Sequence, residues 1–245
     1  MRPRIAIPLP HGSDPEYSER AIPQYEHAIE AAGGEPVRIP LDRPPADVMK
    51  LIERCDAVLL PGSKADVDPA KFGAERHPKT ADADPKRDTV DELLLQDAYN
   101  MRKPVLGICY GLQILNVYRC GTLIQHIETP VNHEAGWKVP IAHEVDIEPG
   151  SRLNEIADAR MISANSSHHQ SAGRIGDGLK ITARSPQDGI IEALEGTAPD
   201  HFVLAVQWHP ERSFDDDEIS RRIFRTLVEA ARHKHSELAG EFETN

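Results

Sequence analysis

Short apolar β-type runs alternate with helical stretches over the first 108 residues of the chain. Such alternation is typical of a parallel sheet covered by helices. We therefore expect an α/β fold with three layers: a mostly parallel central sheet with helices on both faces. The expected strands lie at 4–8, 36–40, 57–62 and 104–108, and the expected helices lie at 22–32, 46–54 and 89–101.

The pattern of strands and helices changes in the second half of the chain. From Val139 onward the β-type runs follow one another without long helices between them, which predicts extra antiparallel or edge strands. An acidic run at 215–218 opens a final helix that we expect to end near His233, because acidic residues suit the positive end of a helix dipole. The expected strands here lie at 143–147, 179–183, 189–194 and 202–208, and a frayed tail is expected at 236–245.

The chain has the size of one domain. Its 245 residues, 39% of them hydrophobic, are enough for a full core, and no repeat or linker divides them, so we expect a single domain over 1–245. The stretches at 63–88 and 129–140 interrupt the alternation. The first is rich in Pro, Asp and Lys and is either a disordered excursion or a lid. Its position after the carboxyl end of a strand favours an active-site loop.

Charge and cysteine content exclude several classes of function. The formal net charge of -12 would repel a phosphate backbone, so no nucleic-acid partner is expected. No apolar run has the length of a signal peptide core or a membrane span, which predicts a cytoplasmic protein without a membrane partner. The sequence leaves open whether the protein forms homo-oligomers. The cysteines are odd in number and unpaired in spacing, which argues against disulfides, and Cys55 and Cys120 are expected to fill core positions.

Cys109 lies in the pattern G-x-C-x-G, between an apolar strand and the helix-like run 112–117. A strand, a tight turn and a helix in this order form a nucleophile elbow, in which flanking glycines permit the turn and the side chain stands above the sheet. The helix N-terminus is expected to lower the pKa of the thiol. The alternative is a buried core cysteine with chance glycines, but the strand before and the helix after favour a nucleophile.

His209 and Glu211 end a predicted strand near the C-terminus. Alternate strand residues project to one face, so the carboxylate can reach the imidazole, and Pro210 would help to keep the pair rigid. A thiol nucleophile needs a base, and the base needs a group that fixes its tautomer. A strand end with a solvated glutamate is the alternative, but with Cys109 these residues complete a Cys-His-Glu triad.

Further motifs follow the same order as in a known family. The chain resembles the class I glutamine amidotransferases, and within them the peptidase C26 branch of γ-glutamyl-γ-aminobutyrate hydrolases, over nearly its whole length. The resemblance implies the class I glutamine amidotransferase fold, in which the central sheet is flavodoxin-like. The motifs are Leu60-Pro61-Gly62-Ser63 with Asp66-Val67-Asp68-Pro69, Arg87-Asp88 with Glu92, Gly107-Ile108-Cys109 with Gly111-Leu112-Gln113 and Asn116-Val117, Gly121-Thr122-Leu123, Asn165-Ser166 with His168-His169-Gln170, Asp188-Gly189 with Ile191-Glu192, and Val206-Gln207-Trp208-His209-Pro210-Glu211.

The resemblance implies a mechanism and further site residues. Cys109 would attack the δ-carbonyl of a γ-glutamyl group to form a thioester, and His209 would protonate the departing amine and then activate water. The backbone N–H groups of Gly62 and Tyr110 would form the oxyanion hole, each contributing about 2.7–4 kcal/mol. Two departures from the family pattern, Tyr110 in place of Arg and the run at 118–121 in place of small residues, put the amine leaving group in doubt.

The glutamyl head group would be held by Gln113 and by the loop of Ser167, His168 and His169, again by resemblance. Two other interpretations of the histidine pair are an exposed polar loop and a zinc site. Zinc is disfavoured because no cysteine or acidic ligand lies nearby at metal spacing. We therefore expect no metal and no cofactor.

The leading hypothesis is a stand-alone hydrolase whose partner is a small-molecule γ-glutamyl substrate, because no synthetase module accompanies the predicted domain. One rival is a glutaminase subunit that delivers ammonia to a separate synthetase. A second rival is a non-catalytic binding protein on the same scaffold, although its usual sign is a broken triad. Hydrolysis of γ-glutamyl peptides or polyglutamate would differ only in the leaving group.

Overall fold

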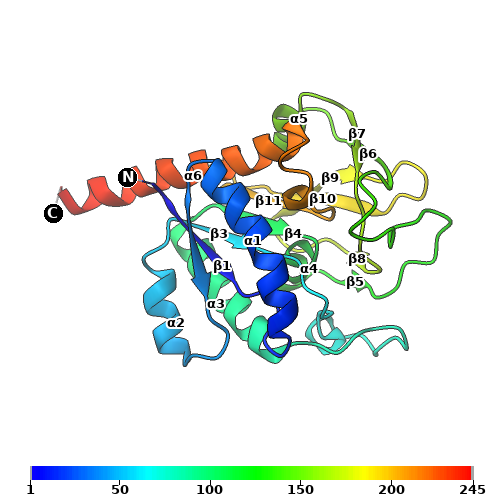
Figure 1. The fold of residues 1–245 in the computed structure, drawn as a ribbon, viewed down its shortest axis with the longest axis horizontal. Helices are drawn as coiled ribbons and strands as arrows, with labels where there is room; N and C mark the ends of the chain where they lie inside the picture. Colours follow the sequence, from blue (N-terminus) through cyan, green and yellow to red (C-terminus); the bar gives the residue numbers. More distant parts are fainter. Residues whose placement is uncertain (1, 244–245) are drawn as a thin grey trace.

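A nine-stranded sheet forms the centre of the computed structural model, which describes residues 2–243 (Figure 1). The strand order is β2-β1-β3-β4-β11-β10-β9-β6-β7. From β2 to β11 neighbouring strands run parallel, and from β11 to β7 they run antiparallel. The strands are β1 (Arg4–Pro8), β2 (Glu35–Ile39), β3 (Ala57–Leu60), β4 (Val105–Ile108), β6 (His143–Ile147), β7 (Met161–Ala164), β9 (Leu179–Arg184), β10 (Ile191–Gly196) and β11 (Val203–Val206).

Two hydrophobic cores cover the two faces of this sheet. One core packs α1, α5 and α6 against alternate strand residues such as Ile5 and Ile7, and the other packs α2, α3 and α4 against residues such as Ala6 and Val58. Successive side chains along each strand point to opposite faces of the sheet, so neighbouring residues belong to opposite cores. The helices are α1 (Pro15–Ala31), α2 (Pro45–Ile52), α3 (Pro85–Met101), α4 (Tyr110–Tyr118), α5 (Arg152–Ala157) and α6 (Glu218–Glu243).

These features confirm the predicted α/β fold with helices on both faces and added antiparallel strands. The boundaries of several helices differ from the prediction. Helix α1 begins at Pro15, seven residues before the predicted start at 22, because Asp14 caps it by accepting a hydrogen bond from the backbone N–H of Tyr17. Helix α6 continues to Glu243, since its last turns contain Glu, Leu and Ala, which favour helix. The predicted frayed tail is thus helical through 243, and residues 244–245 lie outside the described part.

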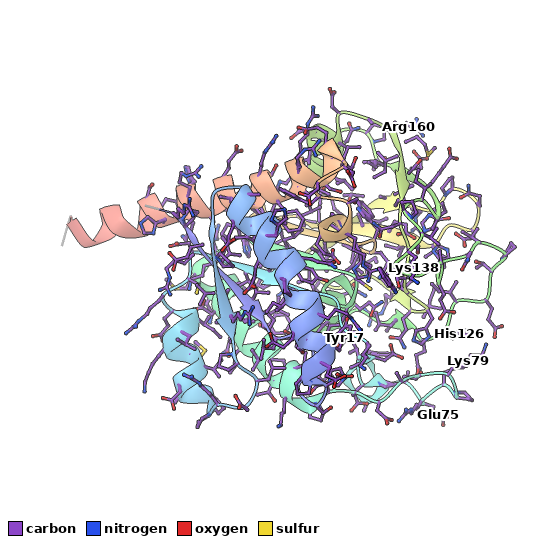
Figure 2. All side chains as sticks on the ribbon, in the orientation of Figure 1. Tyr17, Glu75, Lys79, His126, Lys138 and Arg160 are labelled. Carbon is purple, nitrogen blue, oxygen red and sulfur yellow. The ribbon has the colours of Figure 1, made fainter. Side chains whose placement is uncertain are left out.

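Two long connections reach the carboxyl ends of the parallel strands. The first joins β3 to α3 and contains the short helix η1 (Pro69–Phe72), and the second joins β5 (Leu123–Ile124) to β6. Strand β5 pairs with β8 (Ser171–Ala172) in a separate small sheet. The two connections touch each other: Lys79 Nζ lies 2.9 Å from His126 Nε2, side by side in Figure 2. Within residues 2–243 no helix combines the length and apolar character that a membrane crossing needs.

Candidate active site

Cys109 stands on a strained turn between β4 and α4. Its backbone has φ 53° and ψ -104°, a left-handed conformation that costs a non-glycine residue about 1–3 kcal/mol. The flanking glycines make the turn sterically feasible. A Cβ atom on Gly111 would lie 2.2 Å from the carbonyl oxygen of Leu60, and one on Gly107 would lie 2.8 Å from the backbone of Gly111. The geometry is that of the nucleophile elbow predicted from the sequence.

His209 lies one strand away from Cys109. Strands β4 and β11 are parallel neighbours with Ile108 opposite Val206, and the N–H of Cys109 donates to the carbonyl of Val206 at 2.8 Å. Both predicted catalytic residues therefore follow the carboxyl ends of adjacent strands. In open α/β sheets this edge is where ligands bind.

A carboxylate and an amide fix the orientation of His209. Its Nδ1 lies 2.7 Å from Glu211 Oε1, at the start of helix η2 (Pro210–Arg212), and both side chains are buried. The side chain of Asn165 holds the His209 backbone from both sides: its Oδ1 accepts from the N–H at 3.0 Å and its Nδ2 donates to the carbonyl at 2.9 Å. Because Nδ1 is engaged, Nε2 is the ring nitrogen left for proton exchange.

Burial keeps the predicted nucleophile and base neutral. Burial raises the pKa of the Cys109 thiol to about 12, although Arg212 and the backbone N–H of Tyr110 act in the opposite direction. Burial also lowers the pKa of His209 below 6.5, against the attraction of Glu211. The expectation of a lowered thiol pKa was therefore wrong: the helix N–H does favour the thiolate, but desolvation is larger. Burial therefore favours the neutral thiol and the neutral imidazole.

A polar cavity of about 220 Å³ opens at Cys109. Its walls come from the connection after β3, from the start of α4, from the connection after β5 and from the loop before β8. The cavity therefore joins segments that are far apart in the sequence. The lining residues are Ser63, Lys64, Ala65, Asp66, Cys109, Gln113, Glu134, Ser167, His168, His169 and Gln170.

Neither residue of the predicted oxyanion hole, Gly62 or Tyr110, is among the residues that line this cavity. The N–H of Gly62 donates to the hydroxyl of Tyr25 at 3.1 Å, so this donor is already engaged. Tyr110 begins α4, and its side chain turns away from the cavity, because its buried hydroxyl donates to Asp88 Oδ1 of α3 at 2.7 Å. The tyrosine that departs from the family pattern therefore packs against α3.

The predicted substrate-binding residues all reach the cavity wall. Gln113 is buried, and its Nε2 donates to the carbonyl of Gln170 at 3.2 Å. His169 Nε2 lies 3.1 Å from Asp66 Oδ1, and this hydrogen bond raises the pKa of His169 above 6.5 although burial opposes it. His168 is buried, and its Nε2 points to Glu192, an acidic residue that sequence spacing did not bring near it.

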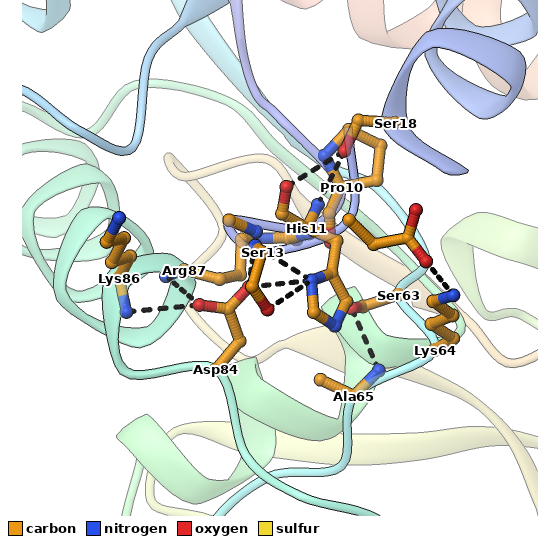
Figure 3. A network of polar contacts seen from close by, with 12 residues as sticks. Pro10, His11, Ser13, Ser18, Ser63, Lys64, Ala65, Asp84, Lys86 and Arg87 are labelled. Carbon is orange, nitrogen blue, oxygen red and sulfur yellow. Dashed lines mark hydrogen bonds and ion pairs between the residues drawn. The ribbon is translucent and has the colours of Figure 1, made fainter. Parts of the chain in front are cut away.

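Sequence reasoning missed several residues of the wall. Lys64 and Asp66 come from the predicted 63–88 active-site loop, and Glu134 comes from the second interruption, at 129–140. Figure 3 shows Lys64 beside a polar network in which His11 Nδ1 lies 3.3 Å from Asp84 Oδ2. The position of these loops after strand ends was the available signal, but it did not identify individual side chains.

Arg87 was also missed as a positioning residue. It is fully buried in α3, its Nε donates to both carboxylate oxygens of Asp91 at 2.8 and 2.9 Å, and its Nη2 donates to the carbonyl of Pro61 at 2.8 Å. A charge-assisted contact of this kind is among the stronger polar contacts in proteins. Arg87 thereby fixes the chain immediately before Gly62.

A profile of the peptidase C26 family matches residues 9–211. The chain belongs to the peptidase C26 family. This membership identifies the chain as an enzyme of the cysteine-dependent hydrolase and amidotransferase class.

Relatives of this C26 protein carry names of the same kind. It is 41% identical to a Mycobacterium tuberculosis protein named provisionally as a glutamine amidotransferase; the match covers 84% of this chain but only 66% of the relative's length. It is 33% identical to γ-glutamyl-γ-aminobutyrate hydrolase PuuD of Escherichia coli K12, with 87% of each chain covered. A Thermoplasma acidophilum crystal structure, provisionally described as one component of GMP synthase, matches 98% of both chains with TM-score 0.67 at 13% identity, which supports the fold alone.

Proposed function

We propose that this C26 protein hydrolyses the amide bond of a small γ-glutamyl amine. Cys109 would act as nucleophile, His209 as general acid and base, and Glu211 as the group that orients His209. One observation carries the proposal: Cys109 stands on a strained elbow at a polar cavity, one strand from a buried His209–Glu211 pair. The name of the Escherichia coli relative supports the γ-glutamyl amine as substrate.

The reaction begins from the neutral thiol and imidazole. Cys109 Sγ attacks the δ-carbonyl carbon while its proton moves to Nε2 of His209. The tetrahedral intermediate collapses as the C–N bond breaks and His209 protonates the amine, which leaves a γ-glutamyl thioester. Water then attacks, His209 takes its proton, and the C–S bond breaks to release glutamate and restore the thiol. One amide and one water give one glutamate and one amine.

The proposed oxyanion donors are the N–H groups of Gly62 and Tyr110. The N–H of Tyr110 favours the charged form of the Cys109 sulfur, which supports its place beside the reacting atoms. The N–H of Gly62 bonds to Tyr25 Oη, so the substrate oxygen has to displace this hydroxyl to use it. Each donor is expected to contribute about 2.7–4 kcal/mol to transition-state stabilisation.

The charges on the cavity wall suit the head group of a free amino acid. Lys64 and His169 are positive candidates for the α-carboxylate, and Asp66 and Glu134 are negative candidates for the α-ammonium group. The raised pKa of His169 favours the cationic form of its ring. A zwitterionic γ-glutamyl group is therefore a better fit than a neutral amide.

A second candidate is a glutaminase subunit that supplies ammonia to a synthetase. It is favoured by the name of the Mycobacterium tuberculosis relative, which is provisionally a glutamine amidotransferase. The chemistry at Cys109 would be the same, and only the amine and the need for a partner would differ.

A panel of γ-glutamyl amides tests these alternatives. Wild-type protein, Cys109→Ala and the matched control Cys120→Ala are incubated with glutamine, γ-glutamyl-γ-aminobutyrate and γ-glutamyl peptides, and released glutamate is measured by mass spectrometry. Release from one or a few γ-glutamyl amines that requires Cys109 but not Cys120 is the expected result. Slow release from glutamine alone would favour the glutaminase subunit, and no release from any compound would contradict the hydrolase.

A further inference from the structure

Four buried side chains from separate segments meet beside the cavity. They belong to the connection before β6, to β6 itself, to the loop before β8 and to β10. One potential ligand atom of each lies within 4.8 Å of those of the other three, and every one of these residues is at most 7% exposed. We call them the His3Glu cluster: His133, His143, His168 and Glu192.

The distances from Glu192 to the three rings are too long for good hydrogen bonds and suit an ion that lies between the carboxylate and the imidazoles. Each imidazole directs one nitrogen at Glu192 Oε1, but a good N–H···O bond spans about 2.7–3.2 Å. Ligands about 2.0–2.1 Å from a tetrahedral ion lie about 3.3 Å from one another. The measured separations from Glu192 Oε1 are 3.4 Å to His133 Nδ1, 3.5 Å to His143 Nε2 and 3.7 Å to His168 Nε2.

The outer nitrogen of each ring already has a partner. Carbonyl oxygens only accept hydrogen bonds, so the two rings that face carbonyls carry their proton on the outer nitrogen and turn a lone pair inward. Histidines that bind metals in proteins are typically held in this way. The outer contacts are His133 Nε2 to Asp188 Oδ2 at 2.9 Å, His143 Nδ1 to the carbonyl of Glu144 at 3.0 Å and His168 Nδ1 to the carbonyl of Gln170 at 2.9 Å.

The inner atoms have no hydrogen-bond partner among the described residues. This holds for the inward nitrogen of each histidine and for both carboxylate oxygens of Glu192. A buried carboxylate without donors is costly, and so are lone pairs directed at it. Protonating all three rings would instead place cations beside one another, since the His133 centroid lies 4.6 Å from that of His143 and 4.9 Å from that of His168. A single cation between the four groups removes both problems.

We propose that the His3Glu cluster binds one divalent transition-metal ion, with zinc as the best fit. Three imidazole nitrogens and one carboxylate oxygen match the ligand types of zinc, whereas calcium and magnesium prefer oxygen ligands alone. Four protein ligands fill a tetrahedral shell and leave no open position for water. The site is therefore structural, and it is separate from the chemistry at Cys109.

The ion would brace the wall of the catalytic cavity. His168 and the cavity residues Ser167 and His169 share one loop, which begins at Asn165, the residue that holds the His209 backbone. The same loop is tied to the neighbouring connection, because the N–H of His168 donates to the carbonyl of His133 at 2.9 Å. Fixing His133 and His168 on one ion would hold two cavity walls together.

Metal analysis of the purified protein tests the site. Wild-type protein is purified without chelator, supplied with zinc, freed of excess zinc and analysed by mass spectrometry of the elements. We expect about one zinc per chain, retained in the buried-histidine control His201→Gln and lost in His143→Asn and Glu192→Gln. Asp188→Asn, which removes the carboxylate behind His133, should weaken zinc binding about 10–100-fold.

Cobalt gives a readout that needs no variant. After zinc is removed, one equivalent of Co²⁺ should give wild-type protein the visible bands of a tetrahedral cobalt site, and added zinc should abolish them. Wild-type protein that binds no zinc and shows no such bands would overturn the proposal. So would zinc that stays bound in folded His143→Asn and Glu192→Gln, because the ion would then lie elsewhere.

Discussion

His209 and the His3Glu cluster both set imidazole rings against a buried glutamate, but the spacing differs. In the first region one ring meets one carboxylate at 2.7 Å, a short hydrogen bond. In the second region three rings approach Glu192 Oε1 at 3.4–3.7 Å and make no hydrogen bond to it. The first arrangement suits the movement of a proton, and the second suits the retention of a cation. Burial and residue type alone do not separate the two roles.

The largest expected effect concerns Cys109, the proposed nucleophile, which acts with the first region and not with the His3Glu cluster. Cys109→Ala should lower glutamate release by at least about 10⁴-fold, because no other group can form the thioester. The zinc content should stay at the wild-type level, since Cys109 does not belong to the His3Glu cluster. Glutamate release and bound zinc are measured on the same samples. Turnover by a folded Cys109→Ala protein would contradict the assignment.

Replacing either Glu211 or Glu192 by glutamine tests the difference between the two regions most directly. Glu211→Gln should reduce kcat by about 10³–10⁴-fold, because the amide no longer fixes the tautomer of His209, and should leave zinc bound. Glu192→Gln should lose zinc and have the smaller effect on kcat. The paired measurement is kcat with zinc content for each variant. If Glu211→Gln loses zinc or Glu192→Gln keeps it, the division between the two regions is wrong.

A third histidine–carboxylate pair, His169 with Asp66, sharpens the comparison. It is more exposed than the other two regions, and its hydrogen bond raises the pKa of His169. Asp66→Asn should raise KM for the γ-glutamyl substrate about 10-fold, with a smaller change in kcat, because a charge-assisted contact contributes about 1.5–3 kcal/mol. Steady-state kinetics with Asp82→Asn, an exposed change in the same loop, as control would test this. An unchanged KM would show that Asp66 does not contribute to substrate binding.

The smallest expected effect is on pH dependence. Burial lowers the pKa of His209 below 6.5. At a pH above this pKa the imidazole is neutral and can act as a base. At a pH below this pKa, kcat/KM should fall about tenfold for each pH unit. Because the pKa of Cys109 is raised to about 12, no rise with a midpoint near 8.5 is expected. A pH profile of kcat/KM measured with zinc content at each point checks this. An acid midpoint above 6.5 would contradict the lowered His209 pKa.

The parallel half of the sheet could be predicted because its signals are local. Apolar runs with short helices between them located β1 to β4, and the glycines around Cys109 located the elbow. Helix ends were less accurate: the start of α1 depends on the cap at Asp14, and α5 is too short to give a clear period. Which antiparallel strands pair could not be read from the sequence, because pairing depends on contacts between distant segments.

In the candidate site, too, local motifs could be predicted from the sequence, whereas contacts between distant segments could not. His209 and Glu211 are two residues apart, so a local motif was enough to pair them. The His3Glu cluster joins residues 133, 143, 168 and 192, and no ligand spacing along the chain indicates it. Zinc was disfavoured from the sequence because no cysteine or acidic ligand lies near His168 in the chain, whereas the fold brings Glu192 to it from β10. The pKa of Cys109 was likewise misjudged, and Cys120, which was expected to fill a core position, is exposed, since burial depends on the complete fold.

Labelling with a glutamine analogue that carries a diazoketone in place of the side-chain amide tests the central claim most directly. Such a reagent requires both a pocket for the γ-glutamyl group and a nucleophile at the position of the scissile carbonyl. Peptide mass spectrometry should find Cys109 modified and Cys55 and Cys120 unmodified, with protection by a γ-glutamyl substrate. Labelling that misses Cys109, or that the substrate does not slow, would contradict Cys109 as the nucleophile of a γ-glutamyl hydrolase.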